Sequence, residues 1–125
     1  MIKQKFVSII IPCFNRARTI GRCLDSVFLQ TYKNYEVIVI DDGSTDKSKE
    51  IIDNYYEKFT LKYVYIDNSG GPAKPRNIGI SLSSGEIIAL LDSDDWWLPQ
   101  KLEICIEHIN NGNDLICHNM NIWNK

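Results

Sequence analysis

Three carboxylates within four residues are the part of this chain best suited to chemistry. Asp92, Ser93, Asp94 and Asp95 follow directly on the apolar run 87–91. Because each negative charge disfavours the next, such a cluster needs a cation or hydrogen-bond donors. A hard divalent cation, which prefers oxygen ligands and binds together with phosphate oxygens, is the simplest partner. The alternative is a solvated acidic turn after a strand, which is a common feature of proteins.

The spacing of the acidic residues indicates which of them could contact a sugar and which could bind a metal. Alternate side chains of an extended segment point the same way, so Asp92 and Asp94 are expected to face one side. One of them could contact a sugar hydroxyl while the other binds the metal, with Asp95 as a competing metal ligand. The pattern therefore suits a nucleotide diphosphate bound with a divalent ion.

Other residues offer complementary contacts, and each has a structural alternative. Asp42 could accept a hydrogen bond from a base N–H, and Phe14 could pack on that base or belong to the core. The backbone of Gly70–Gly71 could approach phosphate, or be only a flexible connection. Arg76 could pair with phosphate or lie on the surface. Asp41 could simply cap the turn that follows it.

The hydrophobic pattern predicts strands that alternate with helices. Short apolar runs rich in β-branched residues predict buried strands, and apolar positions spaced by three and four predict helices. Asn15 is expected to cap a first helix that ends near residue 31, and Ser44 or Thr45 to cap the second. The expected strands are residues 6–11, 35–40, 62–66, 86–91 and 114–118.

This alternation predicts a Rossmann-like α/β fold, in which a mostly parallel sheet carries helices on both faces. We expect the strand order third, second, first, fourth, within one domain over residues 1–125. Parallel strands all end at one edge of the sheet, where ligands of open α/β sheets bind. Residues 12–15, 41–42 and 92–95 each end a strand and should therefore meet at that edge.

Composition narrows the function classes. The chain has 125 residues, 44% of them apolar and 24% charged, with a net charge of -2, which is typical of a globular protein and disfavours a nucleic-acid partner. No apolar run reaches the length of a membrane span or a signal-peptide core, which predicts a cytoplasmic protein. His108 and His118 lack a nucleophile partner and are interpreted as structural.

Several binding motifs are absent from the sequence. The four cysteines, none in the paired short spacings of a zinc site, are expected to be reduced core residues: Cys13, Cys23, Cys105 and Cys117. The sequence contains neither G-x-G-x-x-G after the first strand nor G-x-x-x-x-G-K-[ST], which disfavours a dinucleotide-dependent dehydrogenase and a P-loop enzyme.

Four segments in order and spacing resemble the nucleotide-binding half of family 2 glycosyltransferases of the GT-A fold: residues 7–16, 36–46, 76–79 and 90–95. The resemblance implies inverting transfer of a sugar from a nucleotide diphosphate, most often a UDP-sugar, assisted by Mn²⁺ or Mg²⁺. It also implies a DXD-type metal motif. The implied acceptor is a glycan or a lipid-linked glycan, which would place the protein at the inner face of a membrane.

The same resemblance assigns roles to individual residues. Pro12, Cys13 and Phe14 would flank the base, and Asp42 would contact uracil. Asp92 would contact the ribose, Asp94 the metal, and Asp95 is the second metal candidate. Arg76 belongs to a motif near the donor.

The chain departs from the family pattern at its end. The catalytic base of the family, and most of its acceptor site, are expected beyond residue 125, so no base is assigned. The sequence is therefore interpreted as a truncated enzyme, an excised domain or a short natural protein that keeps only the donor-binding half. Two other hypotheses are a non-catalytic module that binds nucleotide sugars and, with less support, a nucleotidyltransferase, which would carry a glycine-rich basic loop after its first strand.

Overall fold

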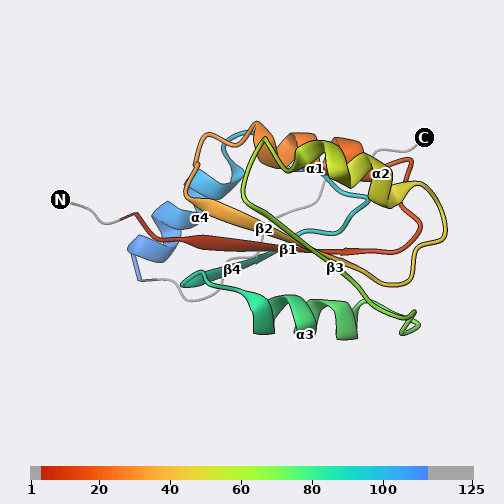
Figure 1. Cartoon of the computed structure of the whole chain (residues 1–125). Helices are drawn as coiled ribbons and strands as arrows, with labels where there is room; N and C mark the ends of the chain where they lie inside the picture. Colours follow the sequence, from red (N-terminus) through yellow and green to blue (C-terminus); the bar gives the residue numbers. More distant parts are fainter. Residues whose placement is uncertain (1–3, 113–125) are drawn as a thin grey trace, which may run out of the picture.

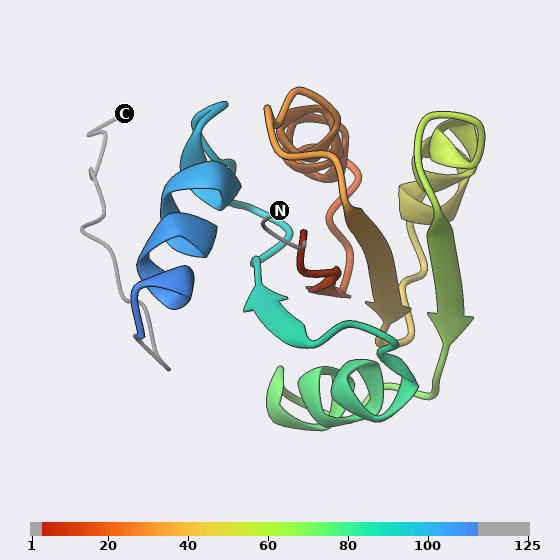
Figure 2. The same ribbon diagram turned by 90° about the vertical axis from the view of Figure 1, so that its left-hand side faces the viewer.

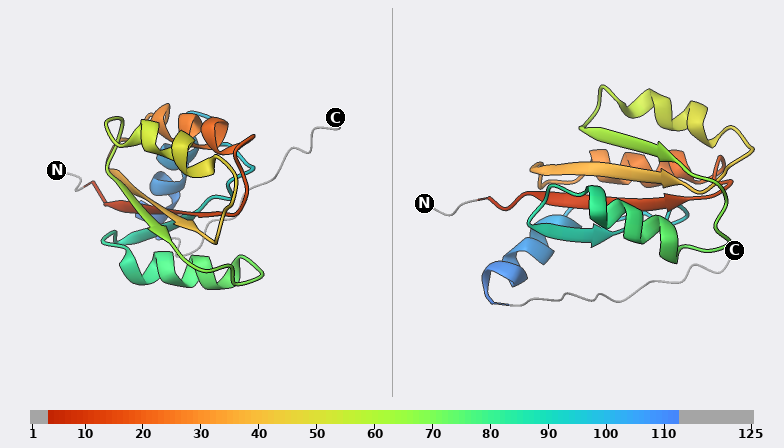
Figure 3. Two further views of the ribbon diagram at one scale, coloured as in Figure 1. Left: turned by 45° about the vertical axis from the view of Figure 1, so that its right-hand side comes forward. Right: turned by 60° about the horizontal axis from the view of Figure 1, so that its bottom comes forward.

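Four parallel strands form the sheet that positions every candidate residue. The computed structural model describes residues 4–112 of the chain. The strands are β1 (Val7–Cys13), β2 (Tyr35–Asp41), β3 (Leu61–Tyr65) and β4 (Ile87–Leu90). Figure 1 labels them, and the right-hand view of Figure 3 shows their order, β3-β2-β1-β4. The predicted strand order is confirmed, whereas the strand expected at residues 114–118 lies outside the described residues.

The two central strands are buried because both of their faces are covered. Every residue of β2 is buried, and in β1 only Pro12 is partly exposed. Their β-branched side chains suit such a doubly covered, parallel sheet. The register pairs Cys13 with Asp41, so the two central strands end side by side. The loops that follow them must therefore leave the sheet at neighbouring points.

Helices cover both faces of the sheet. The helices α1 (Ile20–Phe28), α2 (Ser48–Ile52) and α4 (Lys101–Asn110), with the 3₁₀ turn η1 (Asp53–Tyr55), pack on one face. Of the helices in residues 4–112, α3 (Ala73–Leu82) is the one that covers the other face, as Figure 2 shows. The larger core lies under the first group, and a smaller core under α3 contains Ile10, Ile38 and Ile40.

Close packing fixes the position of α3. A Cβ added to Gly79 would overlap Cγ2 of Ile10 on β1, so only glycine lets the helix lie this near to the sheet. Arg76 lies one helical turn before Gly79 on the same helix. The contact between Gly79 and β1 therefore also fixes the position of the Arg76 backbone relative to the sheet. The residue types in the Arg76–Gly79 segment therefore serve helix–sheet packing as well as the chemistry expected of Arg76.

The expected helix caps are wrong. Asn15 has a φ of 51° and precedes a turn, and α1 begins only at Ile20 and ends at Phe28. The second helix begins at Ser48 rather than directly after Ser44 or Thr45. In both cases the polar side chains bond to a neighbouring loop instead of to their own helix, as described below.

Among the described residues, no helix has the length and apolar character needed to cross a membrane.

A buried carboxylate, paired with a partly exposed lysine, ties together the end of the sheet opposite the candidate residues. Glu36 is 2% exposed, and its Oε1 accepts hydrogen bonds from the Ser8 hydroxyl and the Ser84 N–H, both at 2.8 Å. Its Oε2 lies 3.0 Å from Nζ of Lys62. Burial opposes the charged form, but these hydrogen bonds and the lysine outweigh it and lower the pKa of Glu36 below its ordinary value.

We predict that Glu36→Gln lowers the free energy of unfolding at pH 7 by about 2 kcal/mol, because hydrogen bonds to a buried carboxylate are lost or weakened. The lowered pKa means that this contribution is present above the pKa of the unfolded chain, near 4.5, and is lost as the pH falls through the folded value. The difference between wild type and variant should therefore shrink as the pH falls from 4.5 through the lower folded pKa of Glu36.

Urea unfolding at pH 7 and pH 3 measures this difference. The control is Asp53→Asn, which removes an exposed ion pair of 3.0 Å with Lys49 and should cost no more than about 0.5 kcal/mol. A Glu36→Gln variant as stable as this control, or a loss of stability equal at both pH values, would contradict the assignment.

Candidate functional site

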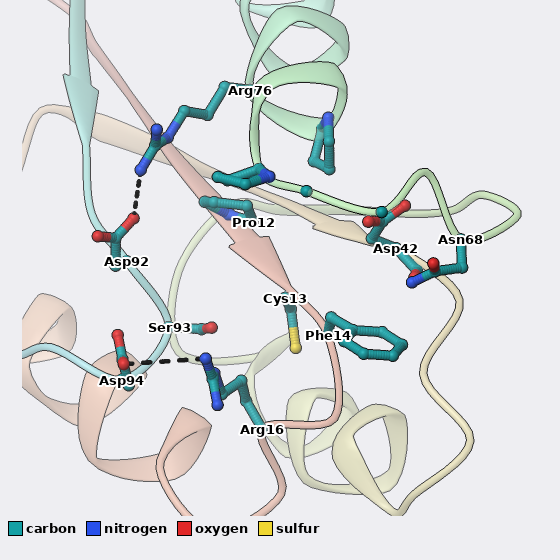
Figure 4. A pocket seen from close by; sticks show the side chains of 14 residues that line it. Pro12, Cys13, Phe14, Arg16, Asp42, Asn68, Arg76, Asp92, Ser93 and Asp94 are labelled. Carbon is teal, nitrogen blue, oxygen red and sulfur yellow. Dashed lines mark hydrogen bonds and ion pairs between the residues drawn. The ribbon is translucent and has the colours of Figure 1, made fainter.

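A cavity of about 560 Å³ opens at the edge where the strands end. Loops after β1, β2 and β4, the segment before α3 and the first turn of that helix form its walls (Figure 4). The predicted residues of all three loops thus meet in one place. The lining residues are Pro12, Cys13, Phe14, Arg16, Asp42, Asn68, Gly70, Gly71, Pro72, Pro75, Arg76, Asp92, Ser93 and Asp94.

The acidic cluster lies at one end of the cavity and fits a hard cation. Each of Asp92, Asp94 and Asp95 offers a carboxylate oxygen, and these oxygens lie within 4.8 Å of one another. The N–H of Asp95 donates to the carbonyl of Asp92 at 3.0 Å, which folds the segment into a turn. Several carboxylate oxygens this close together are a ligand set for Mn²⁺ or Mg²⁺. The turn therefore gathers three groups that an extended strand would have separated.

A buried glutamine holds the segment that follows the cluster. The side chain of Gln30, just after α1, is fully buried. Its Nε2 donates to the carbonyl of Leu98 at 2.8 Å, and its Oε1 accepts from the N–H of Leu102 at 3.0 Å. The hydroxyl of Ser26 on α1 also accepts from the N–H of Trp97 at 3.1 Å. The segment directly after the acidic turn is thus tied to the C-terminal part of α1 and the residues that follow that helix.

Two arginines face two of the carboxylates from different sides (Figure 4). Nη2 of Arg76, from α3, lies 2.7 Å from Oδ1 of Asp92. Nη2 of Arg16, from the loop after β1, lies 3.9 Å from Oδ2 of Asp94. These cations offset part of the repulsion within the acidic cluster. The first pair is a short charge-assisted hydrogen bond, whereas the second is a loose ion pair.

Asp42 lies at the other end of the cavity and is 4% exposed. The Ser69 N–H donates to its Oδ1 at 2.8 Å, and the Ser69 hydroxyl lies 2.9 Å from its Oδ2. Its N–H donates to the carbonyl of Cys13 at 2.8 Å, and its own carbonyl accepts from Nδ2 of Asn68 at 2.9 Å. A carboxylate oxygen can accept more than one hydrogen bond, so Asp42 can still accept from a ligand.

Gly43 allows the loop of Asn68 and Ser69 to lie against Asp42. Its φ is +83°, a region that side chains rarely adopt. A Cβ at this position would also lie 2.8 Å from the backbone nitrogen of Asn68. Two separate constraints therefore require glycine here, and the second of them positions a wall of the cavity.

Asp41, unlike its neighbour Asp42, supports the loop after β2 and does not line the cavity. Oδ1 of Asp41 accepts from the N–H of Ser44 at 2.8 Å, as expected of a residue that caps a turn. Its Oδ2 accepts from the hydroxyl of Tyr63. Burial first, and then the hydrogen bond to this carboxylate, raises the pKa of Tyr63. Asp41 is 1% exposed and does not line the cavity, so it supports the loop only.

Asn15 joins the loops after β1 and β2. Its Oδ1 accepts from the N–H of Thr45 at 2.8 Å, and its N–H donates to the hydroxyl of Ser44 at 2.8 Å. Oδ2 of Asp46 in turn accepts from the N–H of Ala17 at 3.0 Å. These reciprocal bonds explain why the polar residues do not cap their own helices. They make the two loops a single unit beside the cavity.

The cysteines in the described part of the chain are free thiols. Burial, with a smaller effect from Asp41, raises the pKa of Cys13 to about 11. Burial likewise raises the pKa of Cys23. Both thiols are therefore protonated at neutral pH and poor nucleophiles. Cys13 takes part in the cavity as a small apolar wall, Cys105 is half-buried on α4, and Cys117 and His118 lie outside the described residues.

Most of the residues expected at the site from the sequence line the one cavity: Pro12, Cys13, Phe14, Asp42, Arg76, Asp92 and Asp94. Phe14 is 45% exposed, so it is not a core residue. Asp95 belongs to the acidic cluster without lining the cavity. Three residues were not foreseen: Arg16, Asn68 and Ser69. Only their positions next to expected motif residues could have drawn attention to them.

The fold and the cavity define an α/β domain of the kind that binds ligands beyond the carboxyl ends of its strands. Residues 8–124 match the family described as Glycosyl transferase family 2. This chain belongs to that family, and its fold is the GT-A fold. The sequence resemblance is thereby confirmed.

Relatives and solved structures agree with this assignment. An uncharacterized glycosyltransferase of Rickettsia bellii is 40% identical over 118 residues, which are 94% of this chain and 17% of that protein. Staphylococcus aureus TarS in complex with UDP matches with a TM-score of 0.82 and 36% identity, over 86% of this chain and 32% of TarS. This chain therefore spans less than a third of each of these two proteins.

A second structural neighbour was solved with a metal ion. The mannosyltransferase PcManGT of Pyrobaculum calidifontis, in complex with GDP-Man and Mn²⁺, has a TM-score of 0.71 and 29% identity. The match covers 76% of this chain and 29% of PcManGT. TarS was also solved in complex with UDP-GlcNAc.

We predict that Gly43→Ala lowers the free energy of unfolding by about 2–4 kcal/mol, because it adds a steric overlap with Asn68 to the cost of the positive φ. Gly70→Ala is a matched control, since Gly70 has a φ of +86° but no atom within 4 Å of the added Cβ. That control should lose only about 1–2 kcal/mol. Urea unfolding compares the two variants, and equal losses would show that contact with Asn68 does not constrain Gly43.

Proposed function

We propose that this chain binds the nucleoside diphosphate of a UDP-sugar in the cavity and forms the donor-binding part of an inverting, metal-dependent glycosyltransferase. The observation that carries the proposal is the placement of Asp42 and the acidic cluster at two ends of one cavity. That separation suits a ligand with a base at one end and a diphosphate at the other. The UDP and UDP-GlcNAc complexes of TarS support the same donor class.

At the base end, the chemistry of Asp42 favours uracil. An ionised carboxylate only accepts hydrogen bonds, and uracil offers an N–H between two carbonyl groups. Cytosine offers an unprotonated ring nitrogen there, which would face the carboxylate with like polarity. Ser69 holds both oxygens of Asp42, so the acceptor cannot turn away easily. Phe14 and Pro12 would pack on the flat faces of the base.

At the diphosphate end, Asp92 would contact the ribose, while Asp94 and Asp95 would hold Mn²⁺ or Mg²⁺. When bound there, the ion would act as a Lewis acid for the negative charge that develops on the departing diphosphate. Arg76 would keep Asp92 in place through the hydrogen bond of 2.7 Å and would itself lie near the phosphates. The Mn²⁺ complex of PcManGT supports a divalent ion in this class of proteins.

The acceptor side of the reaction completes the proposal. An acceptor hydroxyl would attack the anomeric carbon from the face opposite the diphosphate and would give up its proton to a carboxylate base, for which no residue is assigned. The acceptor would be a glycan or a lipid-linked glycan, used at the inner face of a membrane. The competing hypothesis, a non-catalytic module that binds nucleotide sugars, shares the donor site and differs only in turnover.

We predict that Asp94→Ala weakens binding of UDP in the presence of Mn²⁺ by at least about tenfold, because one of the metal ligands is removed. The free energy of unfolding should change by no more than about 0.5 kcal/mol, since Asp94 is half exposed and its ion pair is loose. Calorimetry with UDP, with and without Mn²⁺, measures the effect, and Asp53→Asn serves as the surface control. Unchanged affinity with Mn²⁺ present would refute the assignment of Asp94.

We predict that Asp42→Asn reduces the preference for UDP over CDP by about tenfold, because the amide can donate as well as accept a hydrogen bond. The ratio of the two dissociation constants is the measured quantity, so a general loss of affinity does not affect it. Thermal unfolding shows whether the buried substitution is tolerated. A ratio equal to that of the wild type would argue against base recognition by Asp42.

A further inference from the structure

The two arginines of the cavity differ in how firmly they are held. Arg76 makes a hydrogen bond of 2.7 Å with Asp92, whereas Arg16 lies 3.9 Å from Asp94. Both partners of the longer pair are about half exposed, at 47% for the arginine and 53% for the aspartate. Within the described residues, this is the one ion pair that Arg16 makes, and no hydrogen bond of its guanidinium accompanies it. A pair of this kind is weak and exchanges its partners readily.

The backbone of Arg16 is fixed, in contrast to its side chain. Its N–H donates to the hydroxyl of Ser48 at 2.9 Å. Its carbonyl accepts from the N–H groups of Thr19 and Ile20 at 3.0 and 2.8 Å. Next to it, Ala17 donates to Asp46. The loop therefore holds a long cationic side chain at the mouth of the cavity and leaves its charged end only loosely attached (Figure 4).

We propose that Arg16 binds the diphosphate of the donor and rests on Asp94 only while the site is free of ligand. The inference builds on the proposed function, because it assigns a second role in the same cavity. A divalent ion bound to Asp94 would offset the negative charge that attracts Arg16, so this weak pair would loosen when the ion binds. The planar guanidinium then meets phosphate oxygens in the same cavity, which it can bind through two parallel N–H groups.

The exchange of Arg16 between Asp94 and phosphate should affect the affinity for the metal alone and the affinity for nucleotide in opposite directions. Without nucleotide, Arg16 occupies Asp94 and repels a cation, so it weakens the binding of metal alone. With nucleotide present, the same side chain stabilises the ternary complex. Arg16 thus couples the two ligands, and by linkage each ligand must strengthen the binding of the other by the same factor. A residue with a purely structural role would change both affinities in the same direction.

The test compares Arg16→Gln with Arg18→Gln in the full chain. Arg18 carries the same charge two residues away, is exposed and does not line the cavity, which makes it a control for net charge. Titration of Mn²⁺ alone is followed by the electron paramagnetic resonance signal of the free ion. Calorimetry measures UDP binding at saturating Mn²⁺. Thermal unfolding confirms that both variants are folded.

We expect Arg16→Gln to bind Mn²⁺ alone about threefold more tightly, because a neighbouring positive charge has been removed. We expect the same variant to bind UDP at saturating Mn²⁺ about tenfold more weakly, because a charge-assisted contact has been lost. Arg16→Lys, which keeps the charge but not the fork, should retain the weak Mn²⁺ binding of the wild type and recover only part of the UDP affinity.

The outcomes separate this inference from the proposed function. If the wild type binds UDP with Mn²⁺ but Arg16→Gln matches Arg18→Gln in either titration, the role of Arg16 is overturned and the donor site stands. Affinities that both fall in Arg16→Gln would also overturn it, in favour of a structural role. If the wild type binds no UDP with Mn²⁺, both proposals fail together.

Discussion

The repulsion among carboxylates gathered at one edge of the sheet is the constraint on which the site depends. The parallel sheet delivers Asp42 and the acidic turn to the same edge, because all four strands end there. The turn from Asp92 to Asp95 then brings three negative charges within 4.8 Å. Solvent screens part of this repulsion, and neighbouring groups that oppose it or hold the backbone in place stabilise the arrangement further. Much of the surrounding structure does one or the other.

The groups that oppose this repulsion or hold the adjacent backbone come from several elements around the cavity. Arg76 approaches from α3, which lies close to the sheet because of Gly79. Arg16 approaches from a loop bonded to the neighbouring loop through Asn15. On the far side, Gln30, just after α1, holds the segment that follows the acidic turn. The rigid parts of the cavity are therefore the backbones, and the adjustable part is the set of charged side chains that face one another.

Much of the fold followed from the sequence because its signals are local. The apolar runs defined the four described strands, and their alternation with helices fixed a parallel sheet and the edge where Asp42 and Asp94 meet. The helix starts were wrong for a physical reason. Asn15 is a good capping residue by type, but it bonds to Thr45 of another loop, and a single sequence carries no signal for that partner. The roles of Arg16 and Ser69 were missed for the same reason, since each depends on a residue distant in the chain.

A titration of the 15N-labelled chain with UDP in the presence of Mg²⁺, followed by NMR, tests the central claim most directly. If one cavity holds the base at Asp42 and the diphosphate at the acidic turn, the amide signals of Ser69 and of Asp94 will shift together with a single dissociation constant. The amide of Ser84, which bonds to Glu36 at the opposite edge of the sheet, will stay in place. Shifts at only one of the two ends, or with two different dissociation constants, would contradict the account.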